Sequence, residues 1–186
     1  MLKLNDVSFS YNKEKDIIKN FSAEFSKGER VCIKAPSGKG KTTLLRLICS
    51  LEKPDSGTIE FSKKPRIGTV FQSDVLLPWK TAEENVAVVS SKESAKQWLC
   101  DFGLAEALNK YPDELSGGMN RRVAIARAVS FEPDILILDE AFKGIDTETK
   151  EHIMAILKEH FSDRLIIFTS HDESEIESFA TKTINL

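Results

Sequence analysis

A segment rich in glycine and lysine carries the clearest chemical signal in this chain. It reads Ala35-Pro-Ser-Gly-Lys-Gly-Lys-Thr-Thr43 and follows a short apolar run. Glycines let the backbone turn so that successive amide groups point at phosphate oxygens. A lysine and a hydroxyl at the end of such a loop are the groups that bind terminal phosphates and Mg²⁺. The segment therefore predicts a binding loop for a polyphosphate.

The individual positions of this loop have distinct expected parts. We expect Lys41 to reach the β- and γ-phosphates and the Thr42 hydroxyl to bind Mg²⁺. Ala35 stands where the common pattern GxxxxGK[ST] has glycine, and alanine adopts a positive φ only at a cost. We still expect the loop to bind phosphate, through Ala35, Pro36, Ser37, Gly38, Lys39, Gly40, Lys41, Thr42 and Thr43.

A second motif joins an apolar run to two carboxylates, in Ile135-Leu-Ile-Leu-Asp-Glu140. A nearly continuous apolar run predicts a parallel strand that is buried on both faces. Ligands of open α/β sheets bind at the carboxyl ends of such strands. We expect Asp139 to hold Mg²⁺, directly or through water, and Glu140 to accept a proton from an attacking water.

A third motif, Leu115-Ser-Gly-Gly-Met119, opens a predicted helix over Gly117–Ser130. Free amides at a helix N-terminus make an anion site. The chain therefore has two predicted phosphate sites, although one nucleotide needs only one. The residues of this second site are Leu115, Ser116, Gly117, Gly118 and Met119.

Two single polar residues follow predicted strands. Gln72 follows Arg66–Phe71, and His171 comes soon after Arg164–Thr169. If the sheet is parallel, both lie at the same edge as the phosphate loop. Gln72 is then placed to coordinate Mg²⁺ or position water, and His171 to bond a γ-phosphate. A solvated glutamine and a helix-capping histidine are the ordinary alternatives, and spacing alone does not decide between them.

The elements that must position these residues alternate between strands and helices. The segments 2–10 and 17–25 predict an antiparallel pair of strands, and 42–51 predicts a helix with one buried stripe. Thr81 and Glu84 have the spacing of a capping box, and Leu104–Asn109 is expected to continue a helical region. The pattern predicts one domain over 1–186. Its core covers about 1–72 and 131–186, and a helical lobe covers about 73–130.

Composition and charge argue against several functional classes. The net charge of −3 gives no basis for binding nucleic acid through bulk electrostatics. No apolar run reaches the roughly 18 residues of a spanning helix, and the N-terminus has no signal-peptide core. Cys32, Cys49 and Cys100 show no paired spacing, which predicts reduced thiols that pack as small apolar groups.

In this order, the motifs resemble those of the ATP-binding subunit of an ABC transporter over essentially the whole chain. Ala35–Thr43 is similar to the Walker A motif, and Ile135–Glu140 to Walker B with its catalytic glutamate. Leu115–Met119 resembles the family signature. The remaining matches are the Q-loop at Gln72, the D-loop at Phe142–Asp146, the switch histidine at His171 and the adenine-stacking aromatic at Tyr11.

The resemblance implies an α/β P-loop NTPase fold, the ABC ATPase core, with an antiparallel β subdomain and a small helical signature lobe. It implies ATP hydrolysis with Mg²⁺, in which Glu140, His171 and Gln72 are catalytic and Thr42, Gln72 and Asp139 serve the metal. It also explains the second phosphate site. Two subunits pack head to tail, so that Ser116, Gly117 and Gly118 of one face the γ-phosphate held by Lys41 of the other. Asp146 communicates across that interface.

The implied partners are a second ATP-binding subunit, identical or not, and an integral-membrane permease, with an extracytoplasmic solute-binding protein as a further candidate. The subunit is then cytoplasmic and peripheral on the inner face of the cell membrane. Leu76-Leu-Pro-Trp-Lys80 resembles importer subunits of the nitrate, sulfonate and taurine types. Pro78 and Trp79 are expected near the groove that receives the permease, unless Trp79 packs within the helical lobe.

The sequence departs from the family pattern at Ala35, at Lys143-Gly-Ile and at Asn120-Arg-Arg122, where position 121 usually holds glutamine. Rates and nucleotide affinity are open at these positions. A non-transport ABC ATPase is an alternative, but repair types carry a long coiled coil and translation types two ATPase halves. A nucleotide-gated interaction module is another alternative, against which Glu140 argues.

Overall fold

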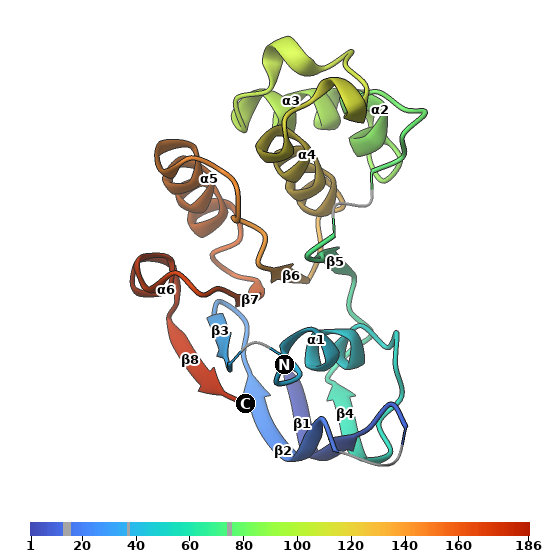
Figure 1. Cartoon of the computed structure of the whole chain (residues 1–186), viewed down its shortest axis with the longest axis vertical. Helices are drawn as coiled ribbons and strands as arrows, with labels where there is room; N and C mark the ends of the chain where they lie inside the picture. The colour runs from blue at the N-terminus through green and yellow to red at the C-terminus, as the bar shows by residue number, and fades with distance from the viewer. Residues whose placement is uncertain (13–15, 37, 74–75) are drawn as a thin grey trace.

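The computed structural model describes residues 1–12, 16–36, 38–73 and 76–186. Two sheets lie one above the other, with helices beyond the second sheet (Figure 1). The first sheet has three strands in the order β2-β1-β4. The second has five strands in the order β5-β6-β7-β3-β8, and all of their pairings are parallel.

The three-stranded sheet is antiparallel and has one face in the core. Its strands are β1 (Leu2–Phe9), β2 (Ile18–Phe25) and β4 (Ser56–Phe61). Apolar side chains of β1 alternate with polar ones, as expected for a half-buried strand. The predicted antiparallel pairing of the first two strands is confirmed.

The parallel sheet consists of β5 (Ile67–Val70), β6 (Ile135–Asp139), β7 (Leu165–Thr169), β3 (Arg30–Lys34) and β8 (Lys182–Asn185). The central strands are buried on both faces, which explains the continuous apolar runs in their sequence. Alternate residues of these strands pack into two separate apolar clusters, one on each side of the sheet. The parallel sheet thus separates two apolar cores.

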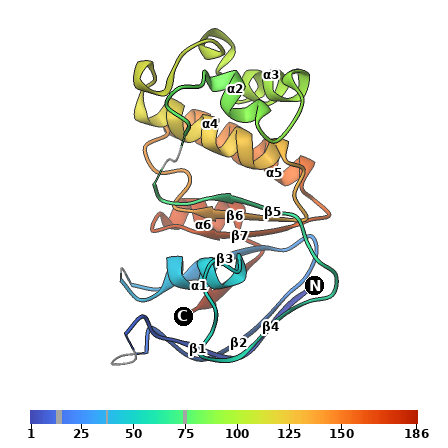
Figure 2. The ribbon, with the colours of Figure 1, turned by 90° about the vertical axis from the view of Figure 1, so that its right-hand side faces the viewer.

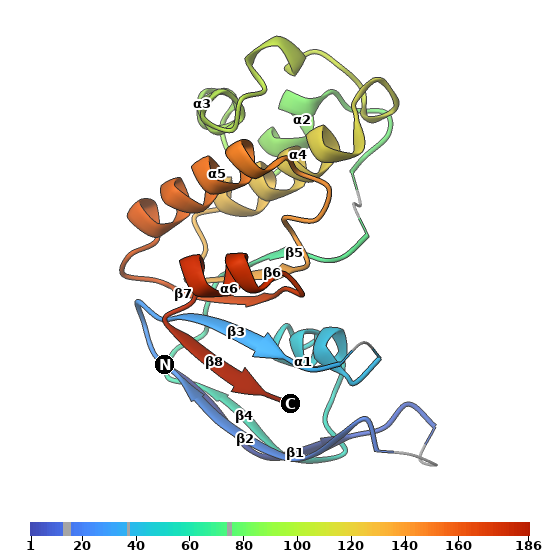
Figure 3. The same ribbon diagram turned by 60° about the vertical axis from the view of Figure 1, so that its left-hand side comes forward.

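Helices cover both faces of this sheet (Figure 2). On one face, α1 (Lys41–Ile48) fills the space between the two sheets and buries its leucine stripe there. On the other face lie α4 (Gly117–Ser130), α5 (Thr147–His160) and α6 (Glu173–Phe179), as Figure 3 also shows. This three-layer arrangement is the α/β fold that the sequence predicts.

A group of helices extends beyond α4. α2 (Ala82–Ala87) and α3 (Lys92–Asp101) pack on α4 and on each other. The capping box of Thr81 and Glu84 is confirmed. Within the described part of the chain, no helix is both long and apolar enough to cross a bilayer.

The expected helix over Leu104–Asn109 is wrong. Only a short 3₁₀ turn forms there, over Ala105–Ala107. The carbonyls that follow have other partners, because the α2 amides of Ala82 and Glu83 donate to Lys110 O and Leu108 O. These bonds satisfy free amides in the first turn of α2, which an α-helix cannot satisfy internally.

The parallel sheet fixes where chemistry can occur. Because its strands run in the same direction, the segments that follow β3, β5, β6 and β7 all leave the sheet at one edge. The phosphate loop, Gln72, Glu140 and His171 follow these strands directly. The fold therefore brings four distant segments to one site, as expected for an open α/β sheet.

Candidate nucleotide-binding site

The phosphate loop connects β3 to α1. Gly38 and Gly40 have left-handed backbone angles (φ 75° and 90°), and Gly40 caps α1. A Cβ at Gly40 would lie 2.9 Å from Ile17 Cγ2, so glycine is needed there for space as well as conformation. Ala35 does not have a positive φ, so alanine at this position introduces no backbone strain. Ser37 lies outside the described residues.

Lys41 lies across this loop with its ammonium group inside it. The side chain is 7% exposed, and Nζ donates to Ala35 O at 2.8 Å. The same atom lies 3.3 Å from His171 Nε2. The ammonium is thus held between the first loop residue and the segment after β7, which is where a γ-phosphate is expected. Pro36 and Lys39 are exposed beside it.

Thr42 and Asp139 meet directly. Thr42 Oγ1 donates to Asp139 Oδ2 at 2.6 Å, and Thr169 Oγ1 donates to Asp139 Oδ1 at 2.6 Å. Asp139 is 2% exposed, so its orientation is fixed by these two hydroxyls. A hydroxyl beside a carboxylate fits Mg²⁺, which binds proteins through one or two oxygen ligands and completes its shell with phosphate and water.

Glu140 follows β6 in an unusual backbone conformation. Its φ is 50°, which costs a non-glycine residue on the order of 1–3 kcal/mol. Thr169 holds this conformation, since the Glu140 amide donates to Thr169 Oγ1 at 3.0 Å and to Thr169 O at 3.2 Å. Strain that is held in this way is typical of a functional site. The conformation places the Glu140 carboxylate against His171, in the loop after β7.

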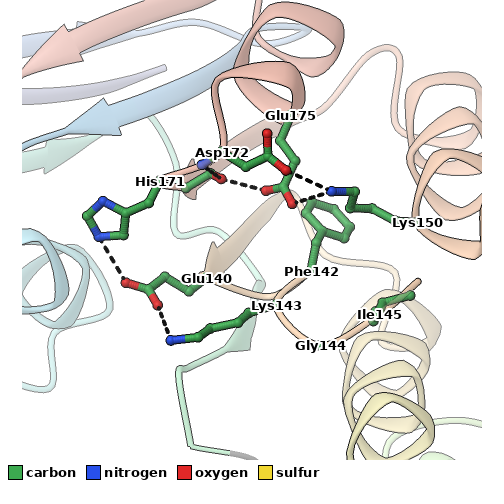
Figure 4. Close-up of a pocket in the computed structure, with 10 residues that line it drawn as sticks. Glu140, Phe142, Lys143, Gly144, Ile145, Lys150, His171, Asp172 and Glu175 are labelled. Atoms are coloured by element: carbon green, nitrogen blue, oxygen red, sulfur yellow. Dashed lines mark hydrogen bonds and ion pairs between the residues drawn. The ribbon is translucent and has the colours of Figure 1, made fainter. Parts of the chain in front are cut away.

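Three side chains surround the Glu140 carboxylate. His171 Nε2 lies 3.3 Å from Oε1, while Lys143 Nζ lies 3.7 Å and Gln72 Nε2 3.5 Å from Oε2. Figure 4 shows the carboxylate between His171 and Lys143. A cavity of about 390 Å³ opens beside it, lined partly by the segment 142–145. The structure thus brings Gln72 to Glu140, and among the described residues no hydrogen bond joins it to Asp139 or Thr42.

The loop that carries His171 is anchored behind the site. The Lys150 ammonium lies 2.9 Å from Glu175 Oε1 and 3.0 Å from Asp172 Oδ2, and the Ser170 hydroxyl donates to Glu175 (Figure 4). Hydrogen bonds from Ser174, followed by the Lys150 bond, lower the pKa of Asp172 to about 2. The imidazole itself is half exposed. Sequence reasoning missed this anchor, because Lys150 lies 22 residues before Asp172 and 25 before Glu175, and no local spacing connects them.

Tyr11 lies at the end of β1, near the phosphate loop. The residue is 54% exposed, and its ring meets Phe9 edge-on, with ring centroids 4.9 Å apart. Its hydroxyl lies 3.4 Å from Thr43 Oγ1. Within the part of the chain that the structure describes, the ring packs on Phe9, and much of Tyr11 stays exposed, so packing on β1 and stacking with a ligand are compatible.

The signature segment forms a well-defined helix N-terminus. Ser116 caps α4 and accepts from the Met119 amide at 3.2 Å. Ser116 and Gly117 are exposed, whereas Leu115 is buried. Among the described residues, no hydrogen bond or ion pair joins 115–119 to the phosphate loop of the same chain. The two predicted phosphate sites are separate within one subunit.

The segment after Glu140 packs on this helix. A Cβ at Gly118 would lie 2.7 Å from Gly144 O, so the close contact requires glycine. Asp146 then caps α5 by accepting from the Thr149 amide at 2.9 Å. That hydrogen bond is the main cause of its lowered pKa.

The loop, the buried aspartate and the strained glutamate together define a P-loop nucleoside triphosphatase. The family model described as ABC transporter matches residues 18–143. The chain belongs to the ABC transporter family and has the fold of its ATP-binding, ATP-hydrolysing subunit.

Similar proteins have related descriptions. The aliphatic sulfonates import ATP-binding protein SsuB of Bacillus cereus is 36% identical over 191 residues, covering 94% of this chain and 76% of that protein. The bicarbonate transport ATP-binding protein CmpD of Synechocystis is 34% identical and covers 98% and 73%. A dimeric ATP-binding cassette, solved in a post-hydrolysis state with ADP and Pi, has a TM-score of 0.92 at 31% identity, covering 100% and 94%.

Proposed function

We propose that this subunit binds ATP on the loop 35–43, hydrolyses it, and drives solute import through a separate membrane permease. The observation that carries the proposal is the meeting of Lys41, Thr42, Asp139, Glu140 and His171 at one edge of the sheet. A lysine, a metal-binding pair and a carboxylate base are the groups that phosphoryl transfer to water needs.

Each group has a role that follows from its contacts. Lys41 and the loop amides stabilise charge on the terminal phosphates. Glu140 accepts the proton of the attacking water, His171 bonds the γ-phosphate, and Gln72 positions water beside Glu140. Thr42 and Asp139 would hold Mg²⁺, which neutralises the charge that develops on the phosphate oxygens when it is bound.

The second phosphate site belongs to a neighbour's ATP in this proposal. Two subunits pack head to tail, and the exposed Ser116 and Gly117 amides of one face the γ-phosphate held by the other. Separation of the two sites within one chain supports this, since neither completes the other. Asp146 contacts the partner across the interface. ATP then favours the closed dimer because it binds that state better than the open one.

The permease contact is proposed at the segment 76–80. Trp79 is 69% exposed, which argues against packing within the helical group. Exposed aromatic side chains commonly anchor protein interfaces. The two relatives named above are described as sulfonate import and bicarbonate transport proteins, so we propose a small charged solute and an extracytoplasmic solute-binding protein. The subunit then works on the cytoplasmic face of the membrane.

Glu140→Gln tests the hydrolytic role. The variant keeps the shape of the side chain but removes the base, so ATP hydrolysis should fall at least about 100-fold. ATP-dependent dimerisation, measured by size-exclusion chromatography with light scattering, should persist. Phosphate release at the wild-type rate would contradict the assignment. Co-purification with a membrane protein separates the transport role from a non-transport ATPase.

A further inference from the structure

Arg121 is a buried cation that links α4 to the segment after β5. Its side chain is on the second turn of α4, and the residue is only 6% exposed. One terminal nitrogen donates to Phe71 O at 2.9 Å, and the other to Gln72 O at 2.8 Å. A single guanidinium therefore holds two successive carbonyl groups of the chain.

These two carbonyls lie at a sensitive point. Among the described strands, β5 is at the edge of the parallel sheet and pairs with β6. Phe71 and Gln72 are the first residues beyond its end, where the sheet no longer fixes the backbone. The Gln72 side chain lies 3.5 Å from the Glu140 carboxylate. The two Arg121 bonds thus hold the stretch of backbone from which the Gln72 side chain reaches Glu140.

Arginine suits this task better than the glutamine that the family pattern has here. Its planar fork presents two separate nitrogens at a fixed spacing. A glutamine side chain is two bonds shorter and has one amide nitrogen, so it cannot make the same paired contact. Hydrogen bonds from a charged donor are also stronger than those from a neutral amide.

The same helix carries the signature at its N-terminus. Gly117 and Gly118 precede Arg121 by one turn, and Gly118 packs on Gly144. A helix is a rigid element over this distance, so a displacement of the signature end is transmitted to Arg121. Arg122 differs, because it bonds Phe102 O and Gly103 O within the helical group.

We propose that Arg121 is a positioning residue that makes the placement of Gln72 depend on the placement of the signature helix. A signature engaged by a neighbour's ATP would then set Gln72 against Glu140 in its own site. This inference rests on the function proposed above, in which the signature binds the partner's ATP.

Arg121→Gln tests it directly in the dimeric, ATP-hydrolysing protein. ATP affinity at the loop should stay within about threefold, whereas kcat should fall about tenfold, because the paired, charge-assisted contact to the two carbonyls is lost. Arg121→Lys keeps the charge without the fork and should lose a similar factor. In both variants, amide hydrogen exchange at Gln72 and Ser73 should become faster. Exchange at the wild-type rate, or equal losses in affinity and kcat, would contradict the proposal.

A double-mutant cycle with Gln72→Ala shows whether the effect passes through Gln72. Gln72→Ala keeps the backbone carbonyl of residue 72, so the Arg121 hydrogen bonds remain. There is then no glutamine side chain for them to position. Adding Arg121→Gln to it should lower kcat by less than about twofold, because coupled residues are not additive. A full tenfold further loss would overturn the coupling. If Gln72→Ala alone hydrolysed ATP normally, the role proposed for Gln72 would fail instead, and the coupling would fail with it.

Arg164→Gln is the matched control for stability. Arg164 also donates to a backbone carbonyl, Pro133 O, but lies before β7 at the opposite edge of the sheet. The Arg164→Gln variant should have a lower Tm, but its kcat should equal the wild-type value at temperatures where both proteins are folded. A similar loss of kcat in this control would mean that general destabilisation explains Arg121→Gln.

Discussion

The phosphate loop and the signature helix are both predicted phosphate sites, yet their surroundings differ. Around the loop, Lys41 lies beside His171, Thr42 bonds Asp139, and Asp139 also bonds Thr169, so the loop is joined to the ends of β6 and β7. At the signature, the Ser116 side chain accepts from Met119 within its own helix turn, and a Cβ at Gly117 would meet nothing within 4 Å in the described part of the chain. The first site is nearly complete within one subunit, while the second presents amides outward. This difference is what a site shared between two subunits requires.

Thr169→Val should have the largest effect on the complete site. The valine keeps the shape but leaves Asp139 Oδ1 without this donor and the Glu140 amide with one acceptor fewer. We expect a loss of about 2–4 kcal/mol in the free energy of unfolding for these buried groups. ATP hydrolysis should fall more than tenfold. Chemical denaturation and steady-state kinetics measure both, and Thr169→Ser, which keeps the hydroxyl, is the control. A valine variant that behaves like the serine variant would contradict this account of Asp139.

Gly118→Ala tests the packing of the signature side. The new Cβ would lie 2.7 Å from Gly144 O, a backbone atom that cannot easily move. We expect a loss of about 1–3 kcal/mol, as for other overpacked positions. Gly117→Ala is the matched control, because its Cβ meets nothing within 4 Å and alanine favours helix. Thermal unfolding of both variants measures the difference. Equal stability of the two would show that α4 does not pack on the segment after Glu140 as described.

The smallest expected effect is a dependence of stability on pH, through Asp172 in the loop that carries His171. The pKa of Asp172 is lowered to about 2 in the folded protein, from an ordinary 3.8. A lowered folded pKa stabilises the protein above the ordinary pKa, and this contribution is lost as the pH falls from about 4 to about 2. Tm should therefore fall less steeply over this range in Asp172→Asn than in the wild type. Parallel Tm curves would contradict the expected role of Asp172.

Local patterns in the sequence were sufficient for much of the fold and for the main residues of the site. The phosphate loop, the buried strand of Asp139 and the N-terminus of α4 each consist of a few consecutive residues. Their chemistry could therefore be predicted from local sequence alone. The placement of Gln72 and His171 needed one further assumption, that the sheet is parallel, and the structure has it so.

Contacts between distant segments were not predictable in this way. Thr169 faces Asp139 only because β6 and β7 pair in one register. Arg121 looked like a departure from a family pattern, and its two carbonyl partners lie about fifty residues earlier in the chain. The short turn at Ala105–Ala107 forms because α2 takes up nearby carbonyls. Each of these depends on tertiary packing, which local propensity does not contain.

A complementation experiment tests the shared site most directly. Lys41→Ala should be unable to hold ATP, and Ser116→Arg should be unable to face a partner's phosphate, so each variant alone should hydrolyse at less than about 1% of the wild-type rate. In a mixed dimer, the intact loop of the Ser116→Arg subunit faces the intact signature of the Lys41→Ala subunit. Mixing equal amounts should restore a substantial fraction of the ATPase rate. If the mixture stays as inactive as its components, or if Ser116→Arg alone is fully active, the two phosphate sites do not form one shared site.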